Sequence, residues 1–287
     1  MKCGRRMIAP VVPYPAALVK AGKTRALVIS DLHIGWEVAL SEKGIHVPTQ
    51  TPKLLQRLKA IIGEYNPERL LIVGDVKHTI AMAELSEWQD VPWFFKELKE
   101  SVKEIEIILG NHDGNLEPLL PENIKLLPSA GTIIGDVGLF HGHRWPPPEL
   151  LNCKVLVMGH IHPVIALRDP AGFRITRQVW VKAKCDAARL AEALLQRQGI
   201  KFEGSIRGSL AKRGIKPKIS QIFIMPSFND FLGGKPLNDE VAYSGESEEA
   251  LGPILRSGAV DMGNAEIYLL DGTFLGNLKQ LKTTFSI

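Results

Sequence analysis

Five clusters of aspartate, asparagine and histidine residues each follow a short apolar run in the first part of the chain. The clusters lie in the segments DLH, GD, GNHD, HGH and GHIH. Their candidate side chains are those of Asp31, His33, Asp75, Asn111, His112, Asp113, His141, His160 and His162. Carboxylate, amide and imidazole donors without a thiolate suit Mn²⁺, Fe²⁺ or Zn²⁺. If these side chains converge, they would form a site for divalent transition metals.

The number of candidate ligands favours two ions over one. The candidate ligands are Asp31, His33, Asp75, Asn111, His141, His160 and His162. A single tetrahedral ion would use fewer donors than these seven residues offer. With Asp75 shared, each ion would keep about four protein ligands and leave positions for water and substrate. Two ions about 3.5–4 Å apart can hold both oxygens of a phosphoryl displacement and lower the pKa of a water molecule. The pattern therefore predicts phosphate-ester hydrolysis with Mn²⁺, or alternatively Fe²⁺, Zn²⁺ or Ni²⁺.

His112 follows a candidate ligand directly, and we expect it to act on the substrate rather than to bind metal. It could protonate the leaving oxygen or stabilise the charge that develops on the phosphate. Asp113 could hold the His112 imidazole in one orientation, as carboxylates do for many functional histidines. The predicted catalytic residues are therefore His112 and Asp113.

The apolar runs that precede the clusters have the composition of buried strands, and helical segments lie between several of them. ALVIS, LLIVG, IEIILG and VLVMG are near-continuous apolar runs. Helices are expected at 51–65, within 83–101 with Pro92 near a start, and at 186–199. Because ligands bind beyond the carboxyl ends of strands in α/β sheets, the clusters should meet at one edge. Later strands with fewer helices predict an added antiparallel portion.

The composition of the 287 residues is that of a globular protein. Hydrophobic residues make up 45%, charged residues 23%, and the formal net charge of +4 permits a polyanionic partner without requiring one. Cys3, Cys153 and Cys185 are too far apart to suggest a disulfide framework, which predicts a reducing, cytoplasmic location. Prolines interrupt the apolar stretch near the N-terminus, and no run reaches the ~18 residues of a membrane span. Neither a signal peptide nor membrane association is expected.

We expect residues 1–287 to form a single domain with two inserted stretches, a basic segment at 196–218 and an acidic loop at 238–249. The wider segment 182–218 holds ten Lys or Arg residues against three Asp or Glu. It could follow a phosphate backbone. The alternative is a solvated helix and loop. No oligomeric state is predicted.

The order DLH, GD, GNHD, H and GHIH over residues 26–163 closely resembles the calcineurin-like metallophosphoesterases. The resemblance implies an α/β fold, a four-layer α-β-β-α metallophosphatase sandwich with two mixed central sheets, and two metal ions. It assigns Asp31, His33 and His162 to one ion and Asn111, His141 and His160 to the other, with Asp75 bridging and His112 catalytic. His143 could replace His141, but the family pattern matches the first histidine of HGH.

Within the family, SDLHIGWE, GDVKH and PSFNDFLGG resemble a subgroup related to the ligase-associated DNA damage response endonuclease and to archaeal phosphoesterases. GDVKH departs from the commoner GDxxD. Lys77 and His78 therefore either reach the substrate phosphate or pack below the site. Arg144 either holds a phosphate or is solvated, and Trp36 either stacks on a base or packs in the core.

The expected function is hydrolysis of phosphodiester bonds in nucleic acid by a two-metal phosphoesterase. The resemblance implies DNA or RNA as partner, a role in DNA repair and a repair protein as a further partner. An enzyme for nucleotides or other small phosphoesters is the alternative. A scaffold that has lost catalysis is disfavoured, because every predicted ligand and His112 are present.

Overall fold

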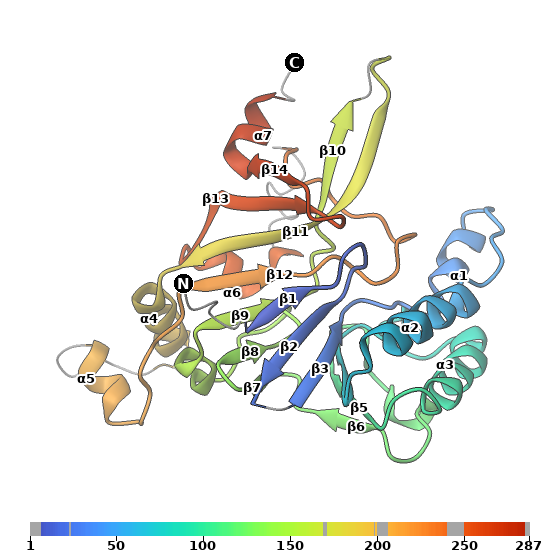
Figure 1. The fold of residues 1–287 in the computed structure, drawn as a ribbon, viewed down its shortest axis with the longest axis horizontal. Helices are drawn as coiled ribbons and strands as arrows, with labels where there is room; N and C mark the ends of the chain where they lie inside the picture. The colour runs from blue at the N-terminus through green and yellow to red at the C-terminus, as the bar shows by residue number, and fades with distance from the viewer. Residues whose placement is uncertain are drawn as a thin grey trace.

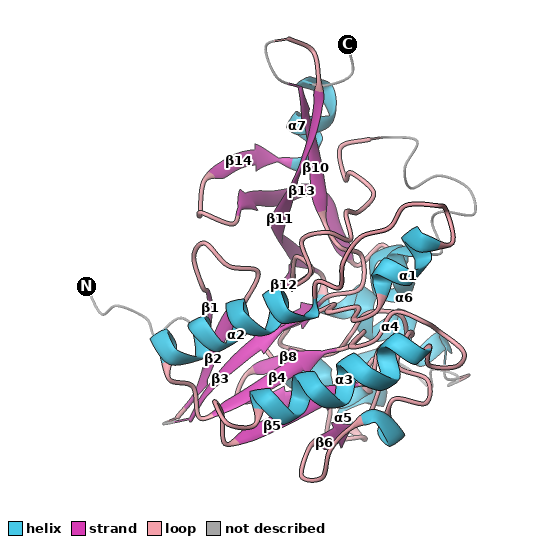
Figure 2. Ribbon diagram, turned by 90° about the vertical axis from the view of Figure 1, so that its right-hand side faces the viewer, coloured by secondary structure: helices cyan, strands magenta, loops and turns pink. Residues whose placement is uncertain are grey.

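Two β-sheets lie face to face, and helices cover the outer face of each (Figures 1 and 2). The computed structural model describes residues 7–22, 24–168, 171–197, 199, 206–239 and 250–284. Most of the acidic loop predicted at 238–249 lies outside these residues, as do residues 198 and 200–205 of the basic segment.

The first sheet has six strands in the order β1-β2-β3-β4-β5-β6. Their bounds are Ile8–Pro10, Ala17–Ala21, Thr24–Ile29, Arg69–Val73, Glu104–Ile108 and Lys125–Leu127. The strands β3 to β6 are parallel, and β1 and β2 extend the edge as antiparallel strands. The loops DLH, GD and GNHD therefore leave neighbouring strands at the same edge.

The second sheet has the order β14-β13-β11-β12-β9-β8-β7, with β10 paired to β11. The bounds of β7 to β10 are Thr132–Ile134, Val137–Leu139, Val155–Met158 and Val164–Arg168; those of β11 to β14 are Arg174–Cys185, Gln221–Ile224, Val260–Leu269 and Phe274–Asn277. The strands β8, β9 and β12 are parallel, and the remaining pairs are antiparallel. The HGH and GHIH loops follow β8 and β9, and the predicted antiparallel portion is present.

The helices α2 (Thr51–Tyr65) and α3 (Leu85–Leu98) cover the first sheet, and α1 (Trp36–Ser41) follows the DLH loop (Figure 2). The apolar sides of α4 (Ala187–Arg197), α5 (Ile206–Ala211), α6 (Gly252–Arg256) and α7 (Leu278–Thr284) join the core outside the second sheet. None of the helices in the described part of the chain has the length and apolar character of a membrane span.

Both faces of the central strands are buried, which explains their near-continuous apolar runs. In β3, Leu27 and Ile29 face the core under α2 and α3, whereas Val28 faces the core between the sheets. In β9, Val157 faces the same inner core, and Leu156 faces the core on the other side. Strands buried on both faces favour such sequences over alternating ones.

The predicted α/β fold with two mixed sheets in four layers is confirmed. The helix expected at 51–65 is α2, and α4 begins where expected, because Asp186 Oδ1 accepts the backbone N–H of Ala188 at 2.9 Å. The expectation for Pro92 was wrong. It lies inside α3, which begins at Leu85 with a capping box formed by Glu84 and Glu87.

Candidate metal centre

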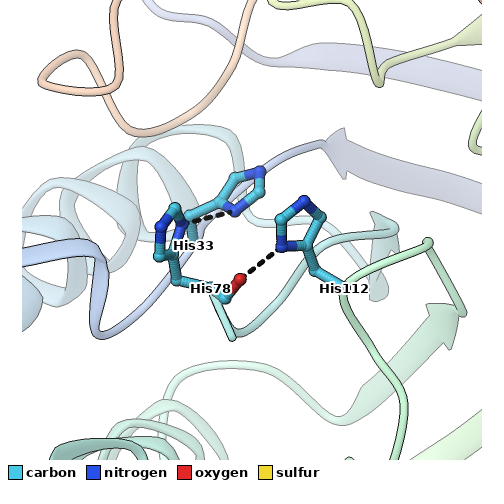
Figure 3. Close-up of side chains that lie close together, drawn as sticks. All are labelled: His33, His78 and His112. Carbon is cyan, nitrogen blue, oxygen red and sulfur yellow. Dashed lines mark hydrogen bonds between the residues drawn. The ribbon is translucent and has the colours of Figure 1, made fainter. Parts of the chain in front are cut away.

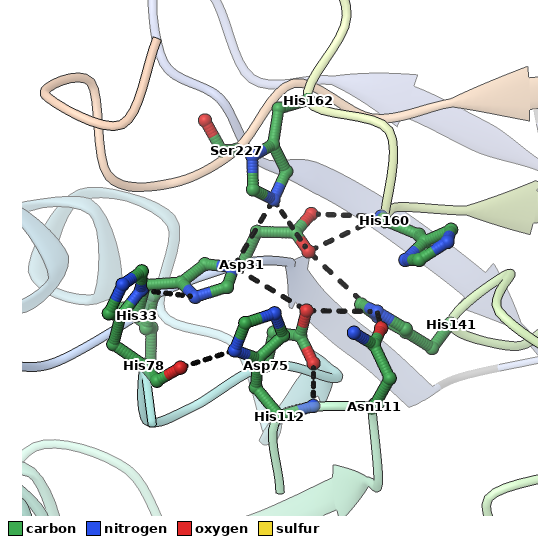
Figure 4. Close-up of polar contacts among 12 residues, drawn as sticks. Asp31, His33, Asp75, His78, Asn111, His112, His141, His160, His162 and Ser227 are labelled. Atoms are coloured by element: carbon green, nitrogen blue, oxygen red, sulfur yellow. Dashed lines mark hydrogen bonds and ion pairs between the residues drawn. The ribbon is translucent and has the colours of Figure 1, made fainter. Parts of the chain in front are cut away.

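The five clusters meet beyond the carboxyl ends of β3, β4, β5, β8 and β9 (Figure 4). Backbone hydrogen bonds join the loops to one another. The N–H of Asp31 donates to the Gly74 carbonyl at 3.1 Å, and the N–H of His33 donates to the Asp75 carbonyl at 2.9 Å. These backbone bonds fix the DLH loop against the GD loop without any contribution from the side chains.

Four side chains form a first group that can hold a cation. The ligand atoms of Asp31, His33, Asp75 and His162 all lie within 4.8 Å of one another. His33 Nε2 is 3.4 Å from Asp75 Oδ2 and 3.2 Å from His162 Nε2, and His162 Nε2 is 3.4 Å from Asp31 Oδ1. Two carboxylates and two imidazole nitrogens that converge in this way are suitable donors for a divalent transition metal.

A second group shares Asp75 with the first and contains His141 and His160. His141 Nε2 lies 3.2 Å from Asp75 Oδ2 and 3.1 Å from Asn111 Oδ1. Its other ring nitrogen, Nδ1, lies 2.9 Å from the Val73 carbonyl and can donate to it, which leaves Nε2 as the ligand atom. The structure thus brings together the residues assigned to each ion, with Asp75 common to both groups.

The electrostatics of the two groups favour a bound cation. Burial raises the pKa of Asp75, but His141 and His33 outweigh it, so that this pKa is held well below its usual range. Burial lowers the pKa of His141, but Asp75 and Asp31 outweigh it and raise this pKa to about 9. Burial lowers the pKa of His160 to about 4. An ionised Asp75 carboxylate and a neutral His160 imidazole are suitable ligands for a divalent cation, and His141 would release its proton when such a cation binds.

The backbone around the ligands is strained, and glycines leave room for it. Positive φ angles are found at Asp31 (59°), His33 (44°), Asp75 (52°), His160 (74°) and His162 (43°). Such conformations are uncommon outside glycine and persist where the surrounding structure holds them, often at functional sites. A Cβ atom at residue 110 would overlap with the Asp75 carboxylate, and one at residue 159 would overlap with Ser30 Oγ.

Asp113 does not contact the His112 ring, contrary to the prediction that it orients this imidazole. Its Oδ2 accepts the backbone N–H groups of Asp75 and Gly110, each at 2.8 Å, and its Oδ1 accepts that of Val76 at 2.8 Å. Burial and the nearby Asp75 raise the pKa of Asp113 to about 6. Asp113 is a buried brace that joins the GD loop to the GNHD loop.

The His78 carbonyl, rather than a carboxylate, contacts the His112 imidazole (Figure 3). His112 Nδ1 can donate to that oxygen, which leaves Nε2 as the ring atom able to exchange a proton with a substrate. The His112 ring is 4.7 Å from the His33 ring between centroids, and His78 Nδ1 lies 3.3 Å from His33 Nδ1. His112 is therefore positioned directly beside the first ligand group.

Two of the residues proposed to bind phosphate do not extend into the site. Lys77 is fully buried, and its Nζ donates to the Thr79 carbonyl, so it packs below the site. Arg144 is exposed, and its Nη1 donates to Ser129 Oγ at 2.7 Å. His143 is partly buried with its ring 5.3 Å from that of His141, and it belongs to neither ligand group.

The described part of the basic segment lies away from the ligands. The backbone N–H of Lys216 donates to Asn152 Oδ1 at 2.7 Å, and that of Lys218 donates to the Leu151 carbonyl at 2.9 Å. These contacts precede the amino ends of the parallel strands β9 and β12, whereas the ligands lie beyond the carboxyl ends. Residues 206–218 therefore fit the solvated alternative better than a path for a phosphate backbone into this site.

Two supporting residues were missed from the sequence. Buried Glu87 of α3 accepts the backbone N–H groups of His78 at 2.8 Å and Thr79 at 2.7 Å. Asn229, in the loop after β12, donates its Nδ2 to the Leu32 carbonyl at 3.0 Å. The polar break PSFND after the strand run QIFIM resembles the other clusters and could have revealed Asn229. Glu87 has no such signal, because it lies within an amphipathic helix.

Comparison with known proteins agrees with this geometry. Residues 24–187 match the family model described as calcineurin-like phosphoesterase. The crystal structure of Pseudomonas putida nuclease MPE aligns with 92% of this chain and 97% of its own, at 20% identity and a TM-score of 0.50. Yfce, a phosphoesterase from E. coli, aligns with 50% of this chain and 73% of its own, at 21% identity and a TM-score of 0.32. The search of curated proteins gave no match. At these identities the structural likeness concerns the fold.

Proposed function

The chain belongs to the calcineurin-like phosphoesterases, metal-dependent hydrolases that use two divalent ions, and we propose that it hydrolyses phosphodiester bonds in nucleic acid. The observation that carries this proposal is the pair of adjacent ligand groups that share Asp75, with His112 beside them. Two ions supply the polarisation of a phosphate and a water molecule of lowered pKa.

The residues of the chain would bind the two ions, donate a proton and hold the loops of the site in place. Asp31, His33 and His162 would hold one ion, Asn111, His141 and His160 the other, and Asp75 would contact both. His112 Nε2 would give a proton to the leaving oxygen, while its Nδ1 stays on the His78 carbonyl. Asp113 and Glu87 hold the loops that carry Asp75, His112 and His78, so that these groups need little rearrangement when substrate binds.

Two observations support an extended polyanion over a small ester as substrate. The β10–β11 hairpin begins at Val164, directly after the GHIH loop, and projects from the body of the molecule (Figure 1). It carries Arg168 and Arg177, both exposed, which are the side-chain type that pairs with phosphates along a backbone. The likeness in fold to a bacterial nuclease over nearly the whole chain agrees with this substrate class.

The test is a substrate panel. Metal-free protein reloaded with Mn²⁺ is assayed on an aryl phosphodiester, an aryl phosphomonoester, and labelled single- and double-stranded DNA. We expect cleavage of the diester and of DNA, with His112→Ala lowering turnover about 100-fold or more. His46→Ala is the matched control, because His46 is exposed and belongs to neither ligand group. Hydrolysis of the monoester alone would contradict the proposal and favour a small-phosphoester enzyme.

A further inference from the structure

An exposed aromatic ring lies close to the loop that carries the first ligands. Phe231, in the loop after β12, is 45% exposed. Its ring stacks on Trp36, with 5.9 Å between centroids and an interplanar angle of 17°. Trp36 is only 9% exposed, so it packs in the core rather than stacking on a base itself. Its buried ring supports the exposed ring of Phe231.

Backbone hydrogen bonds attach the segments that carry both rings to the ligand loop. The backbone N–H of Trp36 donates to the His33 carbonyl at 3.2 Å. On the other side, the N–H of Asn229 donates to the Asp31 carbonyl at 3.3 Å, and the Asn229 side chain accepts the N–H of Phe231 at 3.1 Å. These bonds hold the backbone at Phe231 beside the first metal group, and the stack on Trp36 orients the ring.

Cationic side chains of α2 flank the same loop. Arg57 holds it in place, because its guanidinium lies 4.4 Å from the Phe228 ring and 3.4 Å from the Asp230 carboxylate. Lys53, one helical turn earlier, is exposed, and its Nζ lies over the Phe231 ring, 5.5 Å from the centroid, in a cation–π contact. Sites for single-stranded nucleic acid combine an aromatic ring that stacks on a base with a nearby cation that contacts a phosphate.

We propose that Phe231, supported by Trp36 and flanked by Lys53, stacks on an unpaired base of the nucleotide next to the scissile phosphate. The idea rests on the proposed function and narrows its substrate to single-stranded or unpaired nucleic acid. A base inside a duplex has both faces covered by its neighbours, and it must unstack, at a cost in free energy, before it can reach a protein surface. A single-stranded chain offers an open base face without that cost.

The experiment measures binding, so that it is independent of turnover. In the His112→Ala background with Mn²⁺, fluorescence anisotropy gives the Kd of a labelled thymidine oligonucleotide and of a duplex of equal length. We expect Phe231→Ala and Phe231→Leu to weaken binding of the single strand roughly 5- to 150-fold, the range for loss of a stacking aromatic. Phe231→Leu keeps an apolar side chain against Trp36, and Phe231→Trp should restore the affinity. Phe274→Ala, at a similarly exposed phenylalanine on β14, should change nothing.

A 2-aminopurine base in the same oligonucleotide reports stacking directly. Its fluorescence should be quenched on binding and should recover in the Phe231→Leu protein. An unchanged single-strand Kd in both substitutions, or tighter binding of the duplex than of the single strand, would overturn the stacking proposal. Failure to cleave any diester in the substrate panel would instead overturn the proposed function, so the two failures are distinguishable.

Discussion

Replacement of Asp113 by asparagine tests whether this residue is a brace or an orienter of His112. The side chain is 3% exposed, and its two oxygens accept three short backbone hydrogen bonds, from Asp75, Gly110 and Val76. Asparagine keeps the shape but replaces one acceptor oxygen with an NH₂ donor. Whichever way the amide is turned, at least one buried backbone N–H then faces another donor.

The expected cost follows from that count. A buried donor left without an acceptor costs about 1–3 kcal/mol, and the bonds that remain lose their charge-assisted character. Part of this loss is offset, because the substitution removes a buried negative charge that is repelled by Asp75. Burial and this repulsion raise the pKa of Asp113 to about 6. We therefore expect Asp113→Asn to lower the free energy of unfolding by about 1–3 kcal/mol.

The assay combines urea unfolding of the metal-free protein at neutral pH with calorimetric titration of Mn²⁺. Asp113→Asn should lower both the unfolding midpoint and the Mn²⁺ affinity, because the unpaired N–H groups belong to Asp75 and its neighbours. Asp136→Asn is the control, since Asp136 forms an exposed ion pair with Lys154 that contributes little. Unchanged stability and metal affinity, with turnover as low as in His112→Ala, would refute the brace and restore the orienting role.

Three further predictions concern the same region. Gly110→Ala should weaken Mn²⁺ binding at least about tenfold, because the new methyl group overlaps the Asp75 carboxylate and a displacement of a ligand by about 1 Å is costly. Gly63→Ala is the control, because Gly63 in α2 has open space around it and the substitution should leave Mn²⁺ affinity unchanged. A calorimetric Mn²⁺ affinity of Gly110→Ala equal to that of the wild type would refute the prediction. The pKa of His141 is raised to about 9, above its unfolded value, so the stabilisation is complete below about pH 6.5 and is lost as pH rises through 9. The urea midpoint of metal-free protein should fall over that window and should not fall with saturating Mn²⁺, because the metal requires the unprotonated ring; a rising metal-free midpoint would contradict it. Lys77→Met should leave the salt dependence of DNA binding unchanged, because the buried ammonium contacts Thr79 rather than substrate; a shallower slope would show that Lys77 contacts phosphate.

The ligand clusters were predictable because each one ends a buried strand. In such a chain the strand runs and the parallel order of β3, β4 and β5 are enough to bring Asp31, Asp75 and Asn111 to one edge. The convergence of the two ligand groups on Asp75 was not predictable from the strand order alone. It depends on positive φ angles that turn these side chains toward one another, and periodicity in the sequence does not encode those angles.

The remaining contacts were not predictable because they join residues far apart in the chain. Asp113 follows His112 directly, which suggested a contact between their side chains, yet the carboxylate turns back to the GD loop 36 to 38 residues earlier. Glu87 has the sequence context of a surface residue on an amphipathic helix. Phe231 lies in a loop about 200 residues after the DLH motif, and long-range contacts place that loop beside Trp36, namely the pairing of β12 with β9 and the hydrogen bonds of Asn229.

The most direct test of the two-ion centre is to count the Mn²⁺ ions bound by each chain while measuring hydrolysis of an aryl phosphodiester. The shared position of Asp75 predicts two ions per chain in the wild type, one in His160→Ala, and loss of both sites in Asp75→Ala. Hydrolysis should disappear in both substitutions. A wild-type protein that is fully active with a single ion, or an Asp75→Ala protein that retains two, would contradict the account.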